Sequence, residues 1–206
     1  MKRIANWNIF NHNNYFKIDG RPSIFFYDAT AFINERAAFE EMRSIFKEKN
    51  FNIRVIADST LKIPFTPSDS SWYLKYKDFP YDVLTTWAGF VDANVLNNTI
   101  YIENYNKFYE DLSREWSRFA IEKGMYFMYS LIPGFKYIDR SEAIPRDLGK
   151  FKERFLYIIG LQQNQRFLVR IDTWNDFGEN SYIEPSINEG FSYLNILKET
   201  LKTYNI

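Results

Sequence analysis

The sequence contains no cysteine and a single histidine, His12. Without cysteine, the chain forms neither a disulfide bond nor a thiolate metal site. One histidine is too few for a histidine-based zinc site, and no strand–turn–helix pattern around His12 supports a serine–histidine–aspartate triad. Walker-type and G-x-G-x-x-G loops, which bind phosphate groups, are also missing. The sequence therefore predicts no metal and no cofactor.

An excess of one charge and a long apolar run are missing as well. Lys and Arg together number 26, as do Asp and Glu, so the formal net charge is zero. A nucleic-acid binder needs a basic face, so we expect no nucleic-acid partner. No apolar run is long enough to cross a bilayer, and the N-terminus lacks the apolar stretch of a signal peptide. We therefore expect no membrane partner and, by default, a cytoplasmic location.

The residues that are abundant are aromatic, at 19% of a 206-residue chain whose hydrophobic fraction is 46%. Short aromatic and β-branched runs predict strands at 23–28, 52–58, 82–87, 125–130 and 167–174. Amphipathic patterns predict helices at 31–49, 103–123, 148–162 and 187–204, with a weaker candidate at 70–78. This alternation predicts an α/β fold with a parallel sheet. The longer loops follow strands, as in barrel enzymes, although long loops are equally typical of surface insertions.

Strand parity indicates which charged side chains face inward. Arg170 and Asp172 alternate with apolar residues in the last predicted strand, and Arg54 and Asp58 do so in the second. Charges on one strand face are costly between helix layers but fit the interior of a barrel, where they must be paired. A structural network of ion pairs beneath a site explains these four residues at least as well as catalysis does. Asp176 keeps the same alternation as Asp172, so we expect it to face inward at the open end of the barrel.

Two carboxylates three residues apart, Asp176 and Glu179, follow the last predicted strand. The spacing is typical of a capping box in which Asp176 is the N-cap. Gly178 and Asn180 are poor helix formers, however, and Pro185 ends any helix soon afterwards. Glycoside cleavage, in turn, needs one protonated and one ionised carboxyl group across the bond. Spacing alone leaves both interpretations open.

The wider string TWNDFGENSYIEP (173–185) resembles the last-strand motif of glycoside hydrolase families 71 and 99 and of WbsX-like glycan-processing proteins. HNNYFKIDGRPSIFFYD (12–28) is similar to the stretch that enters the fourth barrel strand of family 99 and WbsX-like proteins. Pro133 and Gly134 resemble the loop after their seventh strand. Those proteins are (β/α)8 barrels. The resemblance implies a TIM-barrel-like architecture in which residues 1–206 form a single partial domain with about the last five βα units.

The resemblance also implies a function. It predicts a glycoside hydrolase that cleaves an α-linked glycan, an α-mannoside or an α-glucan, so a carbohydrate is the expected partner. Glu179 would be the general acid and Asp176 the general base toward water, as in family 71. In family 99 the corresponding Glu assists attack by the substrate's own 2-hydroxyl, a route that the shorter Asp176 fits less well. The expected substrate-binding residues are Trp174, Asn175, Trp87, Asp28, Asp58, Tyr182 and Glu184.

Several alternatives stand beside these expectations. Core packing is an alternative for each tryptophan and explains Trp87 slightly better than sugar binding does. Helix N-capping explains Asp28 and Asp58 equally well. The whole chain is alternatively a non-catalytic remnant that binds sugar or has a structural role, or a WbsX-like protein of polysaccharide assembly. Five strands cannot close an eight-stranded barrel, so we expect exposed edges at 23–28 and 167–174, with nothing nearby that indicates edge protection. Self-association, or a second chain that completes the barrel, follows from those edges.

Overall fold

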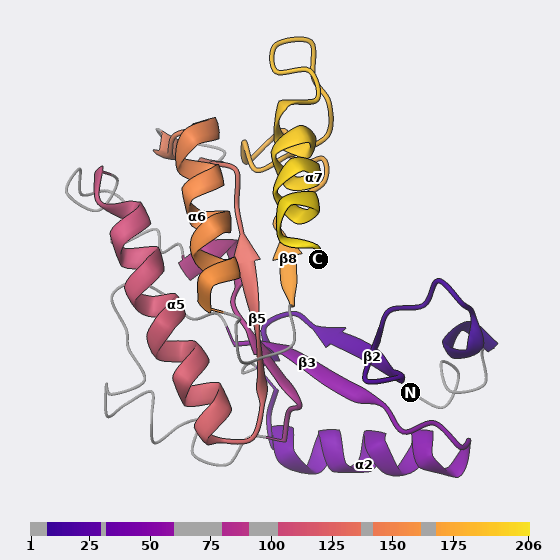
Figure 1. Ribbon diagram of the computed structural model, residues 1–206. Helices are drawn as coiled ribbons and strands as arrows, with labels where there is room; N and C mark the ends of the chain where they lie inside the picture. The colour runs from indigo at the N-terminus through magenta and orange to yellow at the C-terminus, as the bar shows by residue number, and fades with distance from the viewer. Residues whose placement is uncertain (1–7, 30–31, 60–79, 91–102, 137–141, 162–167) are drawn as a thin grey trace.

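A curled parallel sheet forms the centre of the computed structural model, which describes residues 8–29, 32–59, 80–90, 103–136, 142–161 and 168–206 (Figure 1). Its parallel strands pair in sequence order: β2 (Arg21–Phe26), β3 (Arg54–Asp58), β4 (Val83–Thr85), β5 (Tyr126–Leu131) and β8 (Val169–Ile171). The predicted parallel α/β fold is confirmed. The sheet curls into a half-barrel, as expected for part of a TIM-barrel-like fold.

The main helices correspond to the predicted ones, with shifted ends. They are α2 (Glu35–Glu48), α5 (Tyr105–Glu122), α6 (Leu148–Leu161) and α7 (Ser192–Tyr204). The first begins later than predicted because Asn34 is left-handed, with a φ of 55°. The last begins later because a turn bridged between Ser186 and Gly190 precedes it. The weaker helix candidate at 70–78 lies outside the described residues.

Two short antiparallel pairs correct the predicted organisation. Strand β1 (Lys17–Ile18) pairs with the start of β2 through a turn at Asp19 and Gly20, whose φ values are 52° and 72°. Asp-Gly between short strands is a strong hairpin signal, which the prediction overlooked. This pairing covers Arg21 and Pro22, which precede the predicted strand, so the expected exposed edge at 23–28 stays a prediction. The loop after β5 likewise contains a pair, β6 (Phe135–Lys136) and β7 (Glu142–Ile144).

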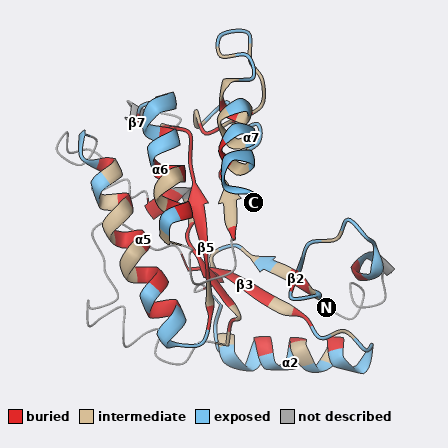
Figure 2. Cartoon of the chain, in the orientation of Figure 1, coloured by how far each residue is buried: buried red, intermediate tan, exposed pale blue. Residues whose placement is uncertain are grey.

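Two apolar clusters lie on opposite faces of the sheet. The outer cluster joins strand residues such as Val55 and Phe127 to helix residues such as Trp116 and Phe155, all at most 2% exposed. Burial of each such side chain contributes about 2–3 kcal/mol relative to exposure. The inner cluster is smaller and consists of Ile18, Ile56, Val83, Met128 and Leu168. Figure 2 shows buried residues along β3 and β5 and on the helix faces toward the sheet.

The clusters confirm the strand parity. Ile56 and Leu168 belong to the inner cluster, whereas Val169 and Ile171 pack against the outer one. Arg54 and Arg170 share the parity of Ile56 and Leu168, so they face inward as predicted. Strand β4 is shorter than predicted and ends at Thr85. Trp87, where the predicted strand ends, instead begins the 3-10 helix η3 (Trp87–Phe90).

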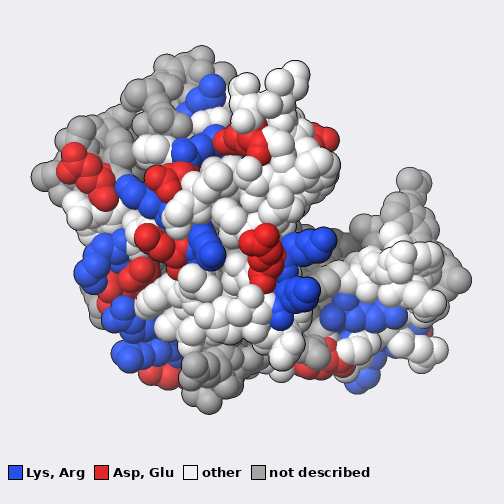
Figure 3. Space-filling model, turned by 45° about the horizontal axis from the view of Figure 1, so that its top comes forward, with Lys and Arg blue, Asp and Glu red and all other residues white. Residues whose placement is uncertain are grey.

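Surface charge agrees with the balanced composition. Basic and acidic side chains are interspersed over the face shown in Figure 3. No helix in the described ranges combines the length and hydropathy that a bilayer span requires.

Candidate functional site

The carboxyl ends of the parallel strands form one rim of the half-barrel. Tyr27 and Asp28 directly follow β2, Asp58 ends β3, and Trp87 lies two residues after β4. Asp176 and Glu179 lie in the segment that follows β8. Because parallel strands point the same way, their carboxyl ends gather at one end of the sheet, which is where barrel enzymes carry their sites.

A buried ion network lies beneath this rim. Arg170 contacts Asp172 with 2.7 Å between Nε and Oδ1, and lies 3.6 Å from Oδ2 of Asp58. Both carboxylates are buried, with 0% exposure for Asp58 and 2% for Asp172. Ser130 donates its hydroxyl to Asp172, and Arg170 donates to the carbonyl of Thr86. Buried charges need such partners, so this network supports the site from below.

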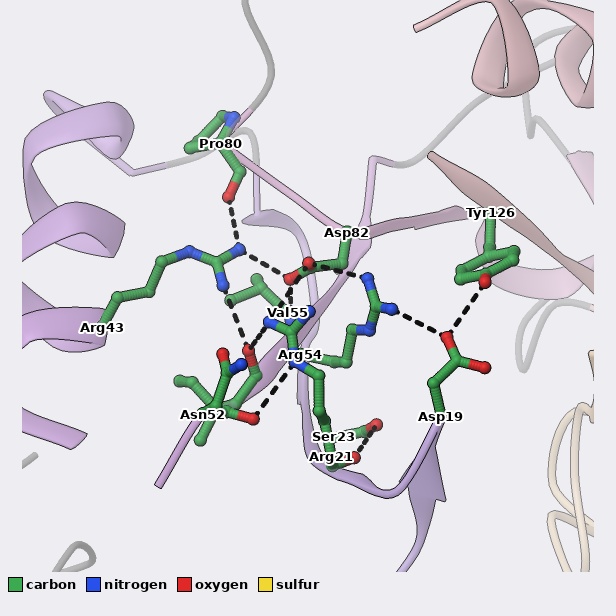
Figure 4. Close-up of polar contacts among 11 residues, drawn as sticks. Asp19, Arg21, Ser23, Arg43, Asn52, Arg54, Val55, Pro80, Asp82 and Tyr126 are labelled. Carbon is green, nitrogen blue, oxygen red and sulfur yellow. Dashed lines mark hydrogen bonds and ion pairs between the residues drawn. The ribbon is translucent and has the colours of Figure 1, made fainter. Parts of the chain in front are cut away.

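Arg54 belongs to a different network at the amino ends of the strands (Figure 4). Its guanidinium contacts Asp82 at 3.1 Å and Asp19 at 2.7 Å, and Arg43 contacts Asp82 at 2.6 Å. Burial would raise the pKa of Asp82, but hydrogen bonds from the Val55 N–H and from Arg43 outweigh it and hold that pKa below its usual value. The network joins β1, β3, α2 and the segment before β4, which is a structural role.

The Asp176–Glu179 segment is a turn held by its own side chains. Asp176 donates its N–H to the hydroxyl of Thr173 over 3.0 Å, and its Oδ1 accepts the N–H of Glu179 over 2.9 Å. Its carbonyl accepts the N–H of Ser181. The hydrogen bond expected of a capping residue is therefore present, but no helix follows until Ser192. The carboxylate orders a turn at the rim and caps no helix.

Glu179 has an altered acidity. Partial burial raises the pKa of its carboxyl group, and the nearby negative charge of Asp176 raises it further. The Glu179 main chain is fixed from the other side by β6, because the N–H of Lys136 donates to the Glu179 carbonyl over 2.8 Å. A carboxyl group that keeps its proton to higher pH, beside a second carboxylate, has the properties of an acid–base pair.

Tyr27 is a site residue that the sequence interpretation missed. Burial raises the pKa of its phenol, and the charges of Asp58, Asp28 and Glu179 raise it further, while Arg170 lowers it. The charges of these groups act on the phenol, which is consistent with Tyr27 lying on the same rim as Asp28, Asp58 and Glu179. The sequence held a signal for Tyr27. Side chains alternate along a strand, so Tyr27 faces the same way as Phe25, whose ring centroid lies 4.8 Å from the inward-facing guanidinium of Arg170.

The predicted aromatic residues have different surroundings. Trp174 is 52% exposed. Trp87 is partly buried, packs against the outer cluster and meets the ring of Tyr27 edge-on at 5.9 Å. Tyr182 stacks on Phe177, with 4.0 Å between ring centroids. Trp174 is thus free to contact a ligand, whereas Trp87 also serves the packing.

The predicted polar residues divide in the same way. Asn175 is exposed, and Glu184 is half-buried with its N–H donated to the Trp174 carbonyl. Asp28 is half-buried at a positive φ of 46° and does not cap α2, whose N-cap is Asn34. Asp58 does cap, because its Oδ1 accepts the N–H of Trp87 at the start of η3. Its complete burial puts Asp58 beneath the rim.

No group of three or more His, Asp or Glu side chains within the described ranges is arranged to hold a metal ion.

Comparisons with known proteins agree with this architecture. The model of a family described as "Glycosyltransferase WbsX" matches residues 3–197. A comparison with curated proteins gives no match. Among solved structures, the chain is similar to a GH99 endo-α-mannosidase from Bacteroides thetaiotaomicron, with a TM-score of 0.66 and 15% identity over 100% of this chain. A structure of the GH99 endo-α-mannosidase from the same organism in complex with bis-tris-propane gives a TM-score of 0.61 and 14% identity over 99% of this chain.

These likenesses concern the fold. The chain spans 63% of the length of the first endo-α-mannosidase chain and 66% of the second. A half-barrel that matches part of such a chain is a partial TIM-barrel-like fold. The family match extends over nearly the whole sequence, including the rim and the Asp176–Glu179 turn. The chain therefore belongs to the WbsX glycosyltransferase family.

Proposed function

We propose that this chain cleaves an α-linked glycan, an α-mannoside or an α-glucan, by acid–base catalysis with two carboxyl groups. The observation that carries the proposal is the turn at the rim, where burial and Asp176 together raise the pKa of Glu179. A general acid must hold its proton at the working pH, and its partner must be ionised. The raised pKa of Glu179 supports its role as the proposed acid, and Asp176 beside it is the proposed base.

In the proposed reaction, Glu179 gives its proton to the glycosidic oxygen as the bond from that oxygen to the anomeric carbon breaks. Asp176 takes a proton from the water whose oxygen bonds to the anomeric carbon. One water is consumed, an alcohol and a reducing sugar are released, and the proton returns from Asp176 to Glu179 through solvent. Because Oδ1 of Asp176 already accepts the Glu179 N–H, Oδ2 is the oxygen that takes the proton.

The surrounding side chains suit a sugar. Tyr27 and Trp174 are large aromatic side chains that are 62% and 52% exposed. Tyr27 lies beside the carboxyl pair, and Trp174 lies just after β8. Aromatic faces provide contact area for the apolar faces of sugar rings. Asn175, Glu184 and Asp28 offer hydrogen-bond partners for hydroxyl groups.

Glycosyl transfer is the second candidate, and the family match favours it. The same two carboxyl groups would act, with a sugar hydroxyl in place of water as the group that Asp176 deprotonates. The new bond would then join donor and acceptor sugars, and no reducing end would be gained.

The test uses the purified chain with α-mannan and α-glucan oligosaccharides, and measures released reducing ends. Asp176→Asn and Glu179→Gln should each lower the rate about 10²- to 10⁴-fold. Glu199→Gln, on an exposed turn of α7, is the matched control and should retain the wild-type rate. Undiminished activity in both site variants would remove the pair from the mechanism.

Two further measurements separate the alternatives. Added acceptor sugar should not divert the product into longer chains if hydrolysis is the reaction, whereas longer products would support transfer. If wild-type protein shows neither reaction but its NMR signals shift with added α-mannoside, the chain is a non-catalytic sugar binder. The proposed catalysis then fails.

A further inference from the structure

Arg146 is a buried arginine that touches the site segment but takes no part in the proposed chemistry. It lies between β7 and α6, and its side chain is 8% exposed. Its Nε and Nη2 form a fork onto the two carboxylate oxygens of Glu189, with 2.8 Å between Nε and Oε1. Its guanidinium lies between two rings, 3.8 Å from the centroid of Tyr182 and 4.4 Å from that of Tyr193.

The remaining nitrogen of Arg146 holds the main chain next to Glu179. Nη1 donates to the carbonyl of Asn180 over 3.0 Å and to the carbonyl of Tyr182 over 2.8 Å. Asn180 directly follows Glu179, whose own carbonyl accepts the N–H of Lys136 in β6. The β5–α6 connection therefore holds the main chain at Glu179 and at Asn180 and Tyr182 just after it.

The geometry points to Arg146, together with Glu189, as a positioning pair that sets the orientation of the Glu179 carboxyl group against Asp176. This inference rests on the proposed function. Glu189 neutralises the charge of Arg146, and burial and Asp176 are what alter the acidity of Glu179. Arg146 therefore acts on Glu179 through the backbone carbonyls that it holds, and not through the electrostatic field of its charge.

Gly134 makes this arrangement possible. A Cβ atom on Gly134 would lie 2.6 Å from Cγ of Arg146 and 3.1 Å from the carbonyl oxygen of Ile144. Backbone and a packed side chain leave no room for a methyl group there. The Pro133–Gly134 motif thus has a local role, because its glycine lets β6 and β7 close around Arg146.

Arg146→Lys is the main variant, because lysine keeps the charge but replaces the planar fork with three donors on one nitrogen. It cannot bind Glu189 and both carbonyls in this geometry. We expect kcat on the α-glycan to fall about 10- to 100-fold with KM little changed, since small misplacements of catalytic groups cost that much. We also expect the titration midpoint of the Glu179 carboxyl to move down toward that of an ordinary glutamate, because a loosened turn is more hydrated.

The midpoint is measured by ¹³C NMR on glutamate-labelled protein, where the Glu179 signal is the one missing from Glu179→Gln. Arg154→Lys is the control. Arg154 is 1% exposed in α6 but donates to Asn106 and to the carbonyl of Ile132. This variant should lower stability and leave the Glu179 midpoint unchanged.

An Arg146→Lys protein with lowered stability, an unchanged Glu179 midpoint and an unchanged kcat would overturn the inference and leave Arg146 a purely structural residue. If that variant does not fold, Gly134→Ala crowds the Cγ atom of the same side chain and must shift the midpoint in the same direction. A wild type without glycosidase activity would end the proposed function. The midpoint comparison would then still decide whether Arg146 orients Glu179.

Discussion

The N–H of Glu179 donates to Oδ1 of Asp176 across 2.9 Å, so the proposed base holds the main chain of the proposed acid. The two residues are therefore coupled twice, once by this hydrogen bond and once by charge, because Asp176 also raises the pKa of Glu179. Loss of the whole Asp176 side chain therefore changes geometry and acidity together. Suitable variants separate the two effects.

Asp176→Asn should preserve the turn and remove the charge. The asparagine Oδ1 still accepts the Glu179 N–H, so we expect the free energy of unfolding to remain near that of wild type. Asp176→Ala should lose about 1 kcal/mol, because that hydrogen bond disappears. Urea unfolding of both variants measures the difference. Equal losses in the two variants would contradict the structural part assigned to Oδ1.

The charge of Asp176 should appear in the titration of Glu179. In Asp176→Asn, the Glu179 midpoint should move down, because a neighbouring negative charge no longer opposes ionisation. Carboxyl ¹³C shifts across an acid-to-neutral pH series measure it. A midpoint that does not move would show that burial alone alters Glu179.

Glu179→Gln should stabilise the fold at neutral pH. A carboxyl whose pKa is raised by folding contributes stability below its unfolded pKa and loses it as pH rises through the folded value. Glutamine resembles the protonated form at every pH. The variant should therefore match wild type below about pH 4.3, the ordinary glutamate pKa, and exceed it in stability above the raised pKa. Thermal unfolding across this pH range measures where the two stabilities diverge.

The activity of wild type should follow the same group. Because the general acid must be protonated, kcat/KM should fall as pH rises through the Glu179 pKa. If kcat/KM falls at the same alkaline pH in Asp176→Asn as in wild type, a group other than Glu179 causes that fall.

Asp82→Asn should destabilise the amino-end network by about 3 kcal/mol, because Arg43 and Arg54 then face a neutral partner in a partly buried site. The folded pKa of Asp82 is lowered, so its contribution is present above the ordinary aspartate pKa of about 3.9 and is lost as pH falls. The stability gap between wild type and variant should thus narrow in acid. Urea unfolding at neutral and acidic pH measures it, and a gap that is independent of pH would count against the ion pairs.

Self-association remains a prediction. In the described part of the chain the sheet ends at β8, and at the other side β1 covers only the start of β2. Unpaired strand edges favour association with a further strand. Light scattering over a concentration series should give a mass that rises above the 24.8 kDa of one chain. A constant monomer mass at high concentration would show that these edges are protected.

Local sequence determined much of this protein. The five parallel strands, the four main helices and the inward direction of Arg170 follow from periodicity, since side chains alternate along strands and repeat along helices. The Asp176–Glu179 pair is likewise visible because its members are neighbours in the chain. The hairpin at Asp19 and Gly20 also had a local signal, in its turn residues.

Tertiary structure alone decided the surroundings of that pair. Arg146 reaches Glu189 across 43 positions, and Tyr27 approaches Glu179 from the opposite end of the sequence. The capping partner of Asp58 was equally invisible in the sequence. Asp58 ends β3, but the N–H that its carboxylate accepts belongs to Trp87, which is part of another βα unit. Periodicity reports which way a side chain faces on its own element. The partner that it meets there is set by strand order and by the curl of the sheet, which bring together residues that local patterns do not relate.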